Sequence, residues 1–133
     1  MAVFVTDTHP LIWYASGKHS RLPQRVLRVF EAAFADQALI VIPSSVFWEI
    51  SLLIEHDKIR VREPFDAWCG AMIARRGIDL AALSLDIIVE AHRFRFNGDP
   101  FDRTIAATAK VMDLPLITKD QAIIESNLVD VYW

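Results

Sequence analysis

Cysteine is almost absent from this sequence, since Cys69 is the only one in 133 residues. A single cysteine excludes an intrachain disulfide and a zinc site built from several cysteines. Within the apolar stretch FDAWCGAMI we interpret Cys69 as a small core residue rather than a nucleophile, because free cysteines are commonly buried.

Long apolar runs are also missing, although 53% of the residues are hydrophobic and the mean hydropathy is +0.28. No run reaches the roughly 18 residues that a membrane-spanning helix needs. The N-terminal MAVFVTDTHP lacks the basic and long apolar regions of a signal peptide. We therefore expect a cytoplasmic protein with no membrane segment, whose surplus apolar surface is covered by a partner.

Linkers, repeats and low-complexity segments are absent as well, so the length predicts a single domain over residues 1–133. Neither sign of charge dominates: 17 acidic residues face 14 Lys and Arg, for a net charge of −3. This balance argues against a simple electrostatic nucleic-acid binder, unless several of the acids are gathered in one pocket.

Short apolar runs alternate along the chain with segments of helical spacing. We predict strands at 2–6, 39–42, 78–83, 114–118 and 128–133, and helices at 10–16, 23–35, 44–56, 63–77, 85–94 and 99–110. This alternation predicts a three-layer α/β fold with a mainly parallel sheet of four to five strands flanked by helices. Ligands of such sheets bind beyond the carboxyl ends of the strands, so functional residues are expected there.

Two acids directly follow predicted strands. Asp7 comes after the first strand in FVTD, and Asp120 follows the fourth in LITKD. Each also has a structural interpretation, because Asp7 could order the turn before Pro10 and Asp120 could cap a short helix. Both interpretations remain open for both residues.

Glu49 lies on an otherwise apolar helix face. Val46, Ile50 and Leu53 have the spacing of a stripe that packs on the sheet, and Glu49 falls on the same face. A buried carboxylate is costly unless it is paired or binds a metal. The alternative is a Glu at the edge of the stripe that pairs with an Arg or Lys.

The stretch NGDPFDRTIAATAK contains two further acids at the start of a helix. Asp99 before Pro100 fits a helix cap followed by the first helical residue. Asp102 then lies at the third helical position, where a capping box or the helix dipole explains it only in part.

Asp7, Glu49, Asp102 and Asp120 would repel one another in one crevice unless they were protonated or neutralised by cations. Without these four, the remaining acids are slightly fewer than the 14 basic residues. Mg²⁺ or Mn²⁺ is the expected cofactor of such oxygen ligands. A metal there would suit phosphodiester cleavage, since it generates hydroxide from water and stabilises the leaving oxygen.

Four ordered motifs resemble those of PIN-domain ribonucleases, and specifically the VapC toxins of VapBC toxin–antitoxin pairs. They are VTDTHPLIW, IPSSVFWEISLLIEHDKI, GDPFDRTIAATA and LPLITKD, and together they extend over essentially the whole chain. The resemblance implies a catalytic and metal-binding pocket of Asp7, Glu49, Asp102 and Asp120 that binds Mg²⁺ or Mn²⁺ and cleaves single-stranded or loop RNA. It also implies a homodimer and a VapB-like antitoxin, whose tail lies in a groove beside the acids.

The same resemblance implies secondary roles for four residues. Asp99 matches an accessory acid of the motif, Thr6 and Thr118 would orient carboxylates or waters, and Arg103 would contact phosphate. The alternatives are ordinary strand positions for the two threonines and a solvated helix side chain for Arg103.

Aromatic side chains are dense in the two middle helices. We interpret Phe47 and Phe65 as core, whereas Trp48 and Trp68 are equally consistent with core packing and with a groove that binds a partner helix. Basic residues could border an RNA path, but we interpret most of them as ordinary surface charge: Arg60, Arg62, Arg75, Arg76, Arg93 and Arg95.

Two other classes compete. A phospho-acceptor receiver domain needs an adjacent acidic pair after the first strand, and a haloacid-dehalogenase-type phosphatase needs Asp-x-Asp there; the sequence has Asp7-Thr8-His9. A non-catalytic RNA- or protein-binding module with a PIN fold is the remaining alternative, and the four acids argue against it.

Overall fold

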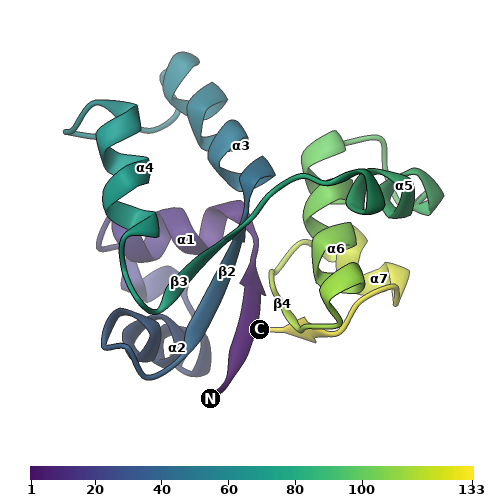
Figure 1. Cartoon of the computed structure of the whole chain (residues 1–133), viewed down its shortest axis with the longest axis horizontal. Coiled ribbons are helices and arrows are strands. Elements are labelled where there is room, and N and C mark those ends of the chain that lie inside the picture. Colours follow the sequence, from purple (N-terminus) through teal and green to yellow (C-terminus); the bar gives the residue numbers. More distant parts are fainter.

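A computed structural model describes residues 1–133 as one five-stranded parallel sheet with helices on both faces (Figure 1). The strands are β1 (Val3–Thr6), β2 (Leu39–Pro43), β3 (Ile78–Ala81), β4 (Leu116–Ile117) and β5 (Val131–Tyr132). The helices are α1 (Thr8–Ala15), α2 (Gln24–Phe34), α3 (Ser44–Glu55), α4 (Phe65–Ile73), α5 (Leu85–Arg93), α6 (Pro100–Met112) and α7 (Gln121–Ser126), with a 3-10 turn η1 (His19–Arg21). The predicted α/β class, with a parallel sheet between helical layers, is confirmed.

The strand order is β3-β2-β1-β4-β5, so the chain reverses its direction of travel across the sheet next to β1. Because crossovers between parallel strands are right-handed, this reversal places α1–α4 on one side of the sheet and α5–α7 on the other (Figure 1). The crevice between β1 and β4 is therefore the topological switch point, where ligands of such sheets bind. Receiver domains have the order 2-1-3-4-5 instead, so that alternative is wrong.

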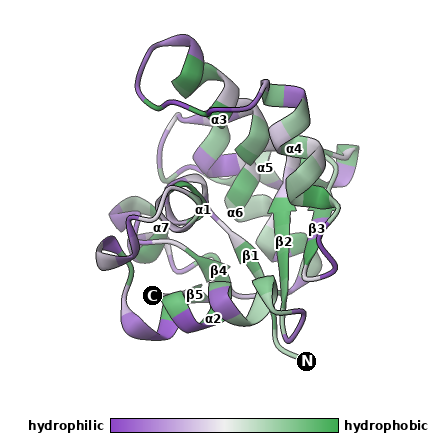
Figure 2. Ribbon diagram, turned by 90° about the vertical axis from the view of Figure 1, so that its left-hand side faces the viewer, coloured by the Kyte–Doolittle hydropathy of each residue, from purple (hydrophilic) through white to green (hydrophobic).

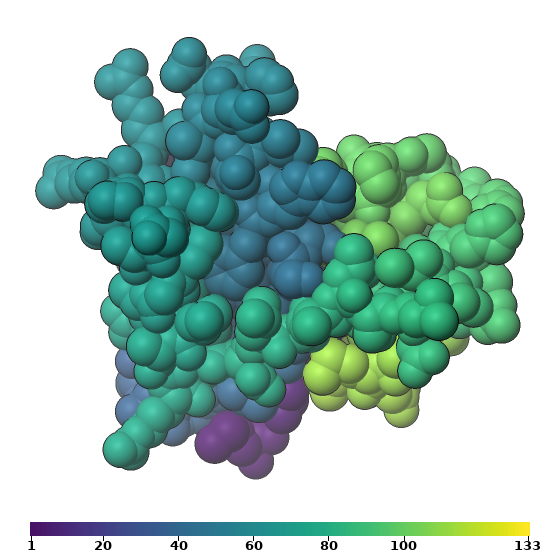
Figure 3. Space-filling model, turned by 45° about the horizontal axis from the view of Figure 1, so that its top comes forward, coloured from purple at the N-terminus to yellow at the C-terminus, as the bar shows by residue number.

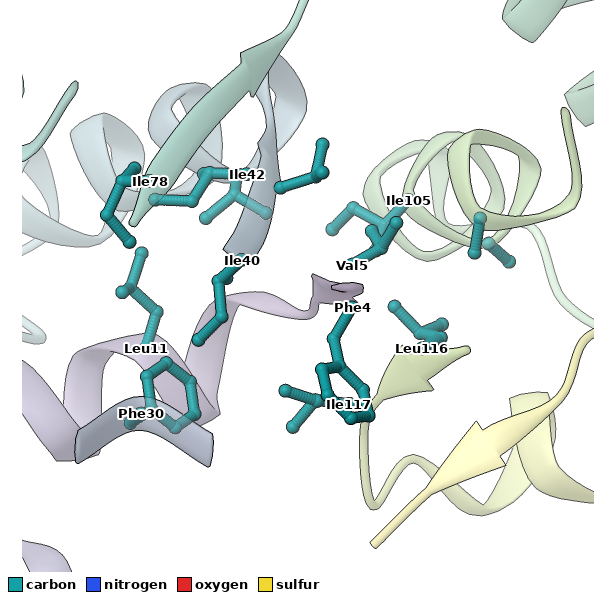
Figure 4. Close-up of a cluster of buried hydrophobic side chains, with 14 of the residues drawn as sticks. Phe4, Val5, Leu11, Phe30, Ile40, Ile42, Ile78, Ile105, Leu116 and Ile117 are labelled. Atoms are coloured by element: carbon teal, nitrogen blue, oxygen red, sulfur yellow. The ribbon is translucent and has the colours of Figure 1, made fainter. Parts of the chain in front are cut away.

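Alternate strand residues build the core on the two faces of the sheet. Phe4 and Val5 are neighbours on β1, and Figure 4 shows Val5 beside Ile105 of α6 while Phe4 lies with Ile117 on the other side. This period of two is what a strand covered on both faces requires, and it explains why the central strands β1 and β2 are almost continuously apolar. All four residues are buried.

Hydrophilic residues lie in the loops and along the outer side of α2, whereas the central strand β2 is hydrophobic (Figure 2). The segment between α3 and α4 is the most extended of these hydrophilic loops in that view. None of the helices combines the length and apolar character needed to cross a membrane.

Two predicted helix ends were wrong. α1 begins at Thr8 rather than Pro10, because the Asp7 side chain caps it, and Pro10 occupies the third helical position. α4 ends at Ile73 rather than at Gly77. A Cβ at Gly77 would lie 1.8 Å from the backbone oxygen of Ala33 on α2, so this glycine serves a close backbone approach and not a helix end.

Four strands are shorter than predicted, since β1 begins at Val3, β3 ends at Ala81, and both β4 and β5 contain two residues. Cys69 is partly buried on α4 and does not belong to the core cluster, so its interpretation as a core residue was wrong. Burial, and secondarily the charge of Asp66, raises the pKa of its thiol. The thiol therefore stays protonated at neutral pH, which agrees with a structural rather than a nucleophilic role.

Candidate functional site

Asp7 occupies the switch point between β1 and β4. Its Oδ1 accepts a hydrogen bond from the Thr8 backbone N–H at 2.8 Å, and its Oδ2 accepts one from the Thr118 hydroxyl at 2.7 Å. Its own N–H donates to the Ile117 carbonyl at 2.9 Å, so both strands fix this residue. Burial raises the pKa of Asp7 above its usual value, even though the hydrogen bonds from Thr118 and Thr8 oppose the shift.

Glu49 extends from α3 toward the same place. The Thr8 hydroxyl donates to its Oε1, and no Arg or Lys pairs with it, because the only ion pair in the structure joins Arg93 and Glu90. The alternative of a surface Glu paired with a base is therefore wrong. Burial, and then the charge of Asp7, raises the pKa of Glu49.

The two acids of the NGDPFDR stretch have different roles. Asp99 caps α6, and its Oδ1 accepts from the N–H groups of Phe101 at 2.8 Å and Asp102 at 3.1 Å. Asp102 makes no capping box; its Oδ2 accepts from the Asn97 amide at 3.0 Å. The helix therefore starts without the Asp102 carboxylate, which is left available for the site.

Burial and neighbouring charges also change the acidity of Asp102. Burial first, and then the negative charges of Asp99, Asp120 and Asp7, raise the pKa of Asp102 to about 7. The amide of Asn97 opposes this shift. A carboxyl group with such a pKa exchanges its proton near neutral pH.

Asp120 caps α7, because its Oδ1 accepts from the Ile123 N–H at 3.0 Å. The capping interpretation is therefore correct, yet Asp120 also belongs to the site, since its charge raises the pKa of both Asp7 and Asp102. The Thr118 hydroxyl accepts from the Asp120 N–H at 3.0 Å while it donates to Asp7, and so links the two acids.

The four carboxylates share one electrostatic environment. The charge of Asp120 raises the pKa of Asp7, and the charge of Asp7 raises that of Glu49. The charges of Asp7 and Asp120 both raise the pKa of Asp102. Asp7, Asp102 and Asp120 also lie at the N-terminal ends of α1, α6 and α7, where the helix dipoles favour negative charge. Nowhere does the structure group three or more His, Cys, Asp or Glu side chains closely enough to form a complete ligand set for one ion.

Comparison with known proteins identifies the fold family of this arrangement. The PIN-domain family model matches residues 4–126. The chain belongs to the PIN-domain family. Its resemblance to that family, inferred from the four motifs, is thereby confirmed.

Solved structures of this fold include toxin–antitoxin complexes. The crystal structure of DNA-bound VapBC from Salmonella typhimurium is 18% identical, with 99% of this chain and 98% of that chain covered at a TM-score of 0.70. VapBC2 from Rickettsia felis, bound to a promoter DNA fragment, is 17% identical over 98% of this chain and 97% of that chain, at a TM-score of 0.68. FitAcB from Neisseria gonorrhoeae is 16% identical over 98% and 96% of the two chains, at a TM-score of 0.60. No curated protein sequence matches the chain.

Two of the predicted accessory residues have other partners in this PIN domain. The Arg103 guanidinium donates to the Ala91 carbonyl at 2.8 and 3.1 Å, so it binds the C-terminal end of α5 and is not free to contact phosphate. The Thr6 hydroxyl donates to the backbone oxygen of Asp7 rather than to a carboxylate. The Thr118 hydroxyl does orient a carboxylate, that of Asp7.

Sequence reasoning missed three residues that the PIN-domain site contains. Thr8 holds Glu49, Asn97 holds Asp102, and the charge of His9 acts on both Asp7 and Glu49. His9 is exposed. Thr8 and His9 directly follow a strand-end acid, and that position at the carboxyl edge of the sheet is the signal that could have identified them.

The two tryptophans differ. Trp48 is 57% exposed and its ring packs edge-on against Phe101 of α6 at 5.2 Å. Trp68 is partly buried, packs edge-on against Phe47 at 6.1 Å, and borders a groove of about 680 Å³. The groove lies between α1, α3, α4 and the loop that joins α3 to α4; its apolar side chains include Ile12, Ile50, Ile59 and Trp68, and its basic ones are Lys18, Lys58, Arg60 and Arg62.

Proposed function

We propose that this PIN domain is the toxin of a VapBC-type pair, a metal-dependent endoribonuclease that hydrolyses RNA phosphodiester bonds and is inhibited by a VapB-like antitoxin. The observation that carries the proposal is the meeting of four carboxylates from four elements at the switch point, where the charge of Asp7 raises the pKa of Glu49 and of Asp102, and that of Asp120 raises the pKa of Asp7 and of Asp102. The likeness to VapBC structures supports the choice of the toxin within the family.

Mg²⁺ or Mn²⁺ suits these residues. The donors are all carboxylate oxygens, they repel one another, and no basic side chain forms an ion pair with them. Mg²⁺ keeps several waters and commonly uses only one or two protein carboxylates, so a complete set of three ligands is not required. Asp7 and Asp120, which Thr118 links, would hold the ion together with Asp102. Glu49 would bind the same ion through the carboxylate oxygen that does not accept from Thr8.

The bound ion would supply hydroxide from water and stabilise the leaving oxygen. The chain itself positions the groups around the phosphate. Thr118 and Thr8 fix the orientation of Asp7 and Glu49, and Asn97 fixes that of Asp102. The N-terminal ends of three helices face the same place and favour the anionic phosphodiester.

The groove beside Trp68 is the site we propose for the antitoxin. Four basic side chains line it against two acids, Asp57 and Glu63, and three isoleucines also line it. An amphipathic antitoxin helix with an acidic edge would match this combination of charge and apolar surface.

We propose a homodimer through α5. Leu85 is 73% exposed, Ile88 46% and Val89 45%, so this helix presents an apolar face with no partner in the monomer. Figure 3 shows residues around 80–95 crossing the surface of the molecule in that view. A second copy of the chain would cover this face.

Cleavage of RNA by the purified protein tests the nuclease proposal. We expect cleavage with Mg²⁺ or Mn²⁺, none with EDTA, and a loss of at least about a hundredfold in rate for Asp7→Asn and for Asp102→Asn. Asp66→Asn, an exposed acid on α4, is the matched control and should cleave normally. Undiminished cleavage by either site variant would sink the mechanism.

Expression without a neighbouring antitoxin gene tests the toxin assignment. Growth arrest that Asp7→Asn relieves is the expected result. Normal growth at a good yield of folded wild-type protein would contradict it. A protein that binds RNA but does not cleave it under any metal condition would favour the non-catalytic alternative.

A further inference from the structure

Basic and aromatic side chains gather around Trp13, next to the four carboxylates. The Lys119 Nζ lies 4.9 Å from the centre of the Trp13 ring, and the Arg21 guanidinium carbon lies 5.7 Å from it. The His9 ring lies 5.9 Å from the same ring. We call His9, Trp13, Arg21 and Lys119 the Trp13 surface.

The fold explains why this surface is next to the acids. Lys119 directly precedes Asp120 at the carboxyl end of β4, and His9 follows Asp7 by two residues on α1. The charge of His9 acts on Asp7 and Glu49, and its ring lies beside that of Trp13. His9 is therefore close both to the acids and to the Trp13 ring that holds the two cations.

The cations of the Trp13 surface have no acidic partners. The structure's single ion pair joins Arg93 and Glu90 on α5, far from this surface in the chain. Arg21 and Lys119 are instead held over the face of Trp13, a contact that restrains each head group and leaves its N–H donors free. His9, Arg21 and Lys119 are exposed, whereas Trp13 is buried and forms a rigid base.

We propose that the Trp13 surface binds the phosphates of a single-stranded RNA whose neighbouring phosphodiester lies at the four carboxylates. This inference rests on the proposed nuclease function. Exposed cations follow the phosphate backbone of single strands, and here the buried Trp13 ring restrains the two cations rather than stacking on a base. The surface also offers attraction where the adjacent carboxylates repel an approaching RNA.

RNA binding can be measured apart from cleavage. The probe is a fluorescein-labelled oligouridylate of about 12 nucleotides, titrated in EDTA and followed by fluorescence anisotropy. The Arg21→Ala/Lys119→Ala double variant should bind at least about tenfold more weakly than wild type at low salt. Because two phosphate contacts are lost, the slope of log K against log salt should become shallower by about 1.4.

Two matched variants control for charge and folding. Arg76→Ala/Lys110→Ala removes the same two charges from exposed positions elsewhere and should bind RNA as wild type does. Arg21→Lys/Lys119→Arg keeps both cations and should retain most of the affinity. Thermal unfolding of each variant verifies that it is folded before binding is compared.

Each outcome decides the inference. Equal binding by wild type and the Arg21→Ala/Lys119→Ala variant overturns it, and so does a wild-type protein that binds no RNA at low salt. An equal loss of affinity in the Arg76→Ala/Lys110→Ala control also overturns it, because net charge would then be sufficient. Wild-type protein that binds RNA through this surface but cleaves none refutes the nuclease proposal alone.

Discussion

At the scale of single residues, Asp102 shows how burial and neighbouring charge change a carboxyl group. Its pKa is raised from 3.8 to about 7, so the folded protein disfavours its charged form. The stability that protonated Asp102 contributes is fully present below about pH 4 and is lost as the pH rises through about 7. The wild-type protein without metal should therefore lose stability between pH 6 and pH 8 on account of this residue.

Asp102→Asn should remove that loss. Because Asp102 is only half buried and solvent screens its charge, we expect about 1 kcal/mol, or about 4 °C in Tm. The Tm difference between the variant and wild type, measured in EDTA, should grow by that amount from pH 6 to pH 8. Asp66→Asn, which changes an exposed acid, should show no such growth.

The effect of Mg²⁺ on the Tm is a second test of the raised pKa of Asp102. A divalent cation favours the charged carboxylates, so added Mg²⁺ should raise the wild-type Tm more at pH 8 than at pH 6. A Tm difference between Asp102→Asn and wild type that does not change with pH would contradict the proposed environment of Asp102.

The sequence predicts which acids belong to the site but not what holds them. Asp7 and Asp120 follow strands, and parallel topology then places them at one edge of the sheet. Thr8 and Asn97 bond to Glu49 and Asp102 through contacts that depend on how α1, α3 and α6 pack. The pattern of strands and helices in the sequence does not determine how these helices pack, so these two residues were not predicted.

At the scale of elements, helix ends were the least predictable feature, because contacts between elements fix them. Gly77 lies just before β3, and in the sequence it predicts the end of the preceding helix, because glycine commonly follows a helix C-terminus. In the structure it lies against the backbone oxygen of Ala33 at the end of α2, so that β3 can reach its place beside β2. The adjoining Ile40 N–H donates to the Gly77 carbonyl at 2.9 Å.

Gly77→Ala should therefore destabilise the protein strongly. The new methyl group would meet a backbone atom at 1.8 Å, which only a shift of α2 or β3 can relieve. We expect a loss of about 2–3 kcal/mol in the free energy of unfolding, measured with denaturant. Gly70→Ala is the control: no atom lies within 4 Å of its Cβ position in α4, so it should stabilise the protein by about 0.5–1 kcal/mol. Equal stability of the two variants would mean that α2 and β3 are not packed in this way.

At the scale of the whole molecule, the weakly negative net charge is the sum of separate acidic and basic regions. Acids meet at the carboxyl edge of the sheet, while unpaired cations lie beside them around Trp13 and line the groove beside Trp68. A count of charges could not predict this division, because it depends on which strand ends become neighbours. The order β3-β2-β1-β4-β5 is what brings Asp7 and Lys119 to the same edge.

Part of the high apolar content of the chain is exposed on α5, where we expect the homodimer to form. Ile88→Lys would place a charge in the proposed interface, and the mass from light scattering should fall from that of two chains to that of one. Ile73→Lys is matched to it, because Ile73 is 43% exposed against 46% for Ile88 and lies at the end of α4. The control should leave the mass unchanged. A wild-type protein that is monomeric at all concentrations, or a dimer that survives Ile88→Lys, would place the uncovered face of α5 in contact with something other than a second copy.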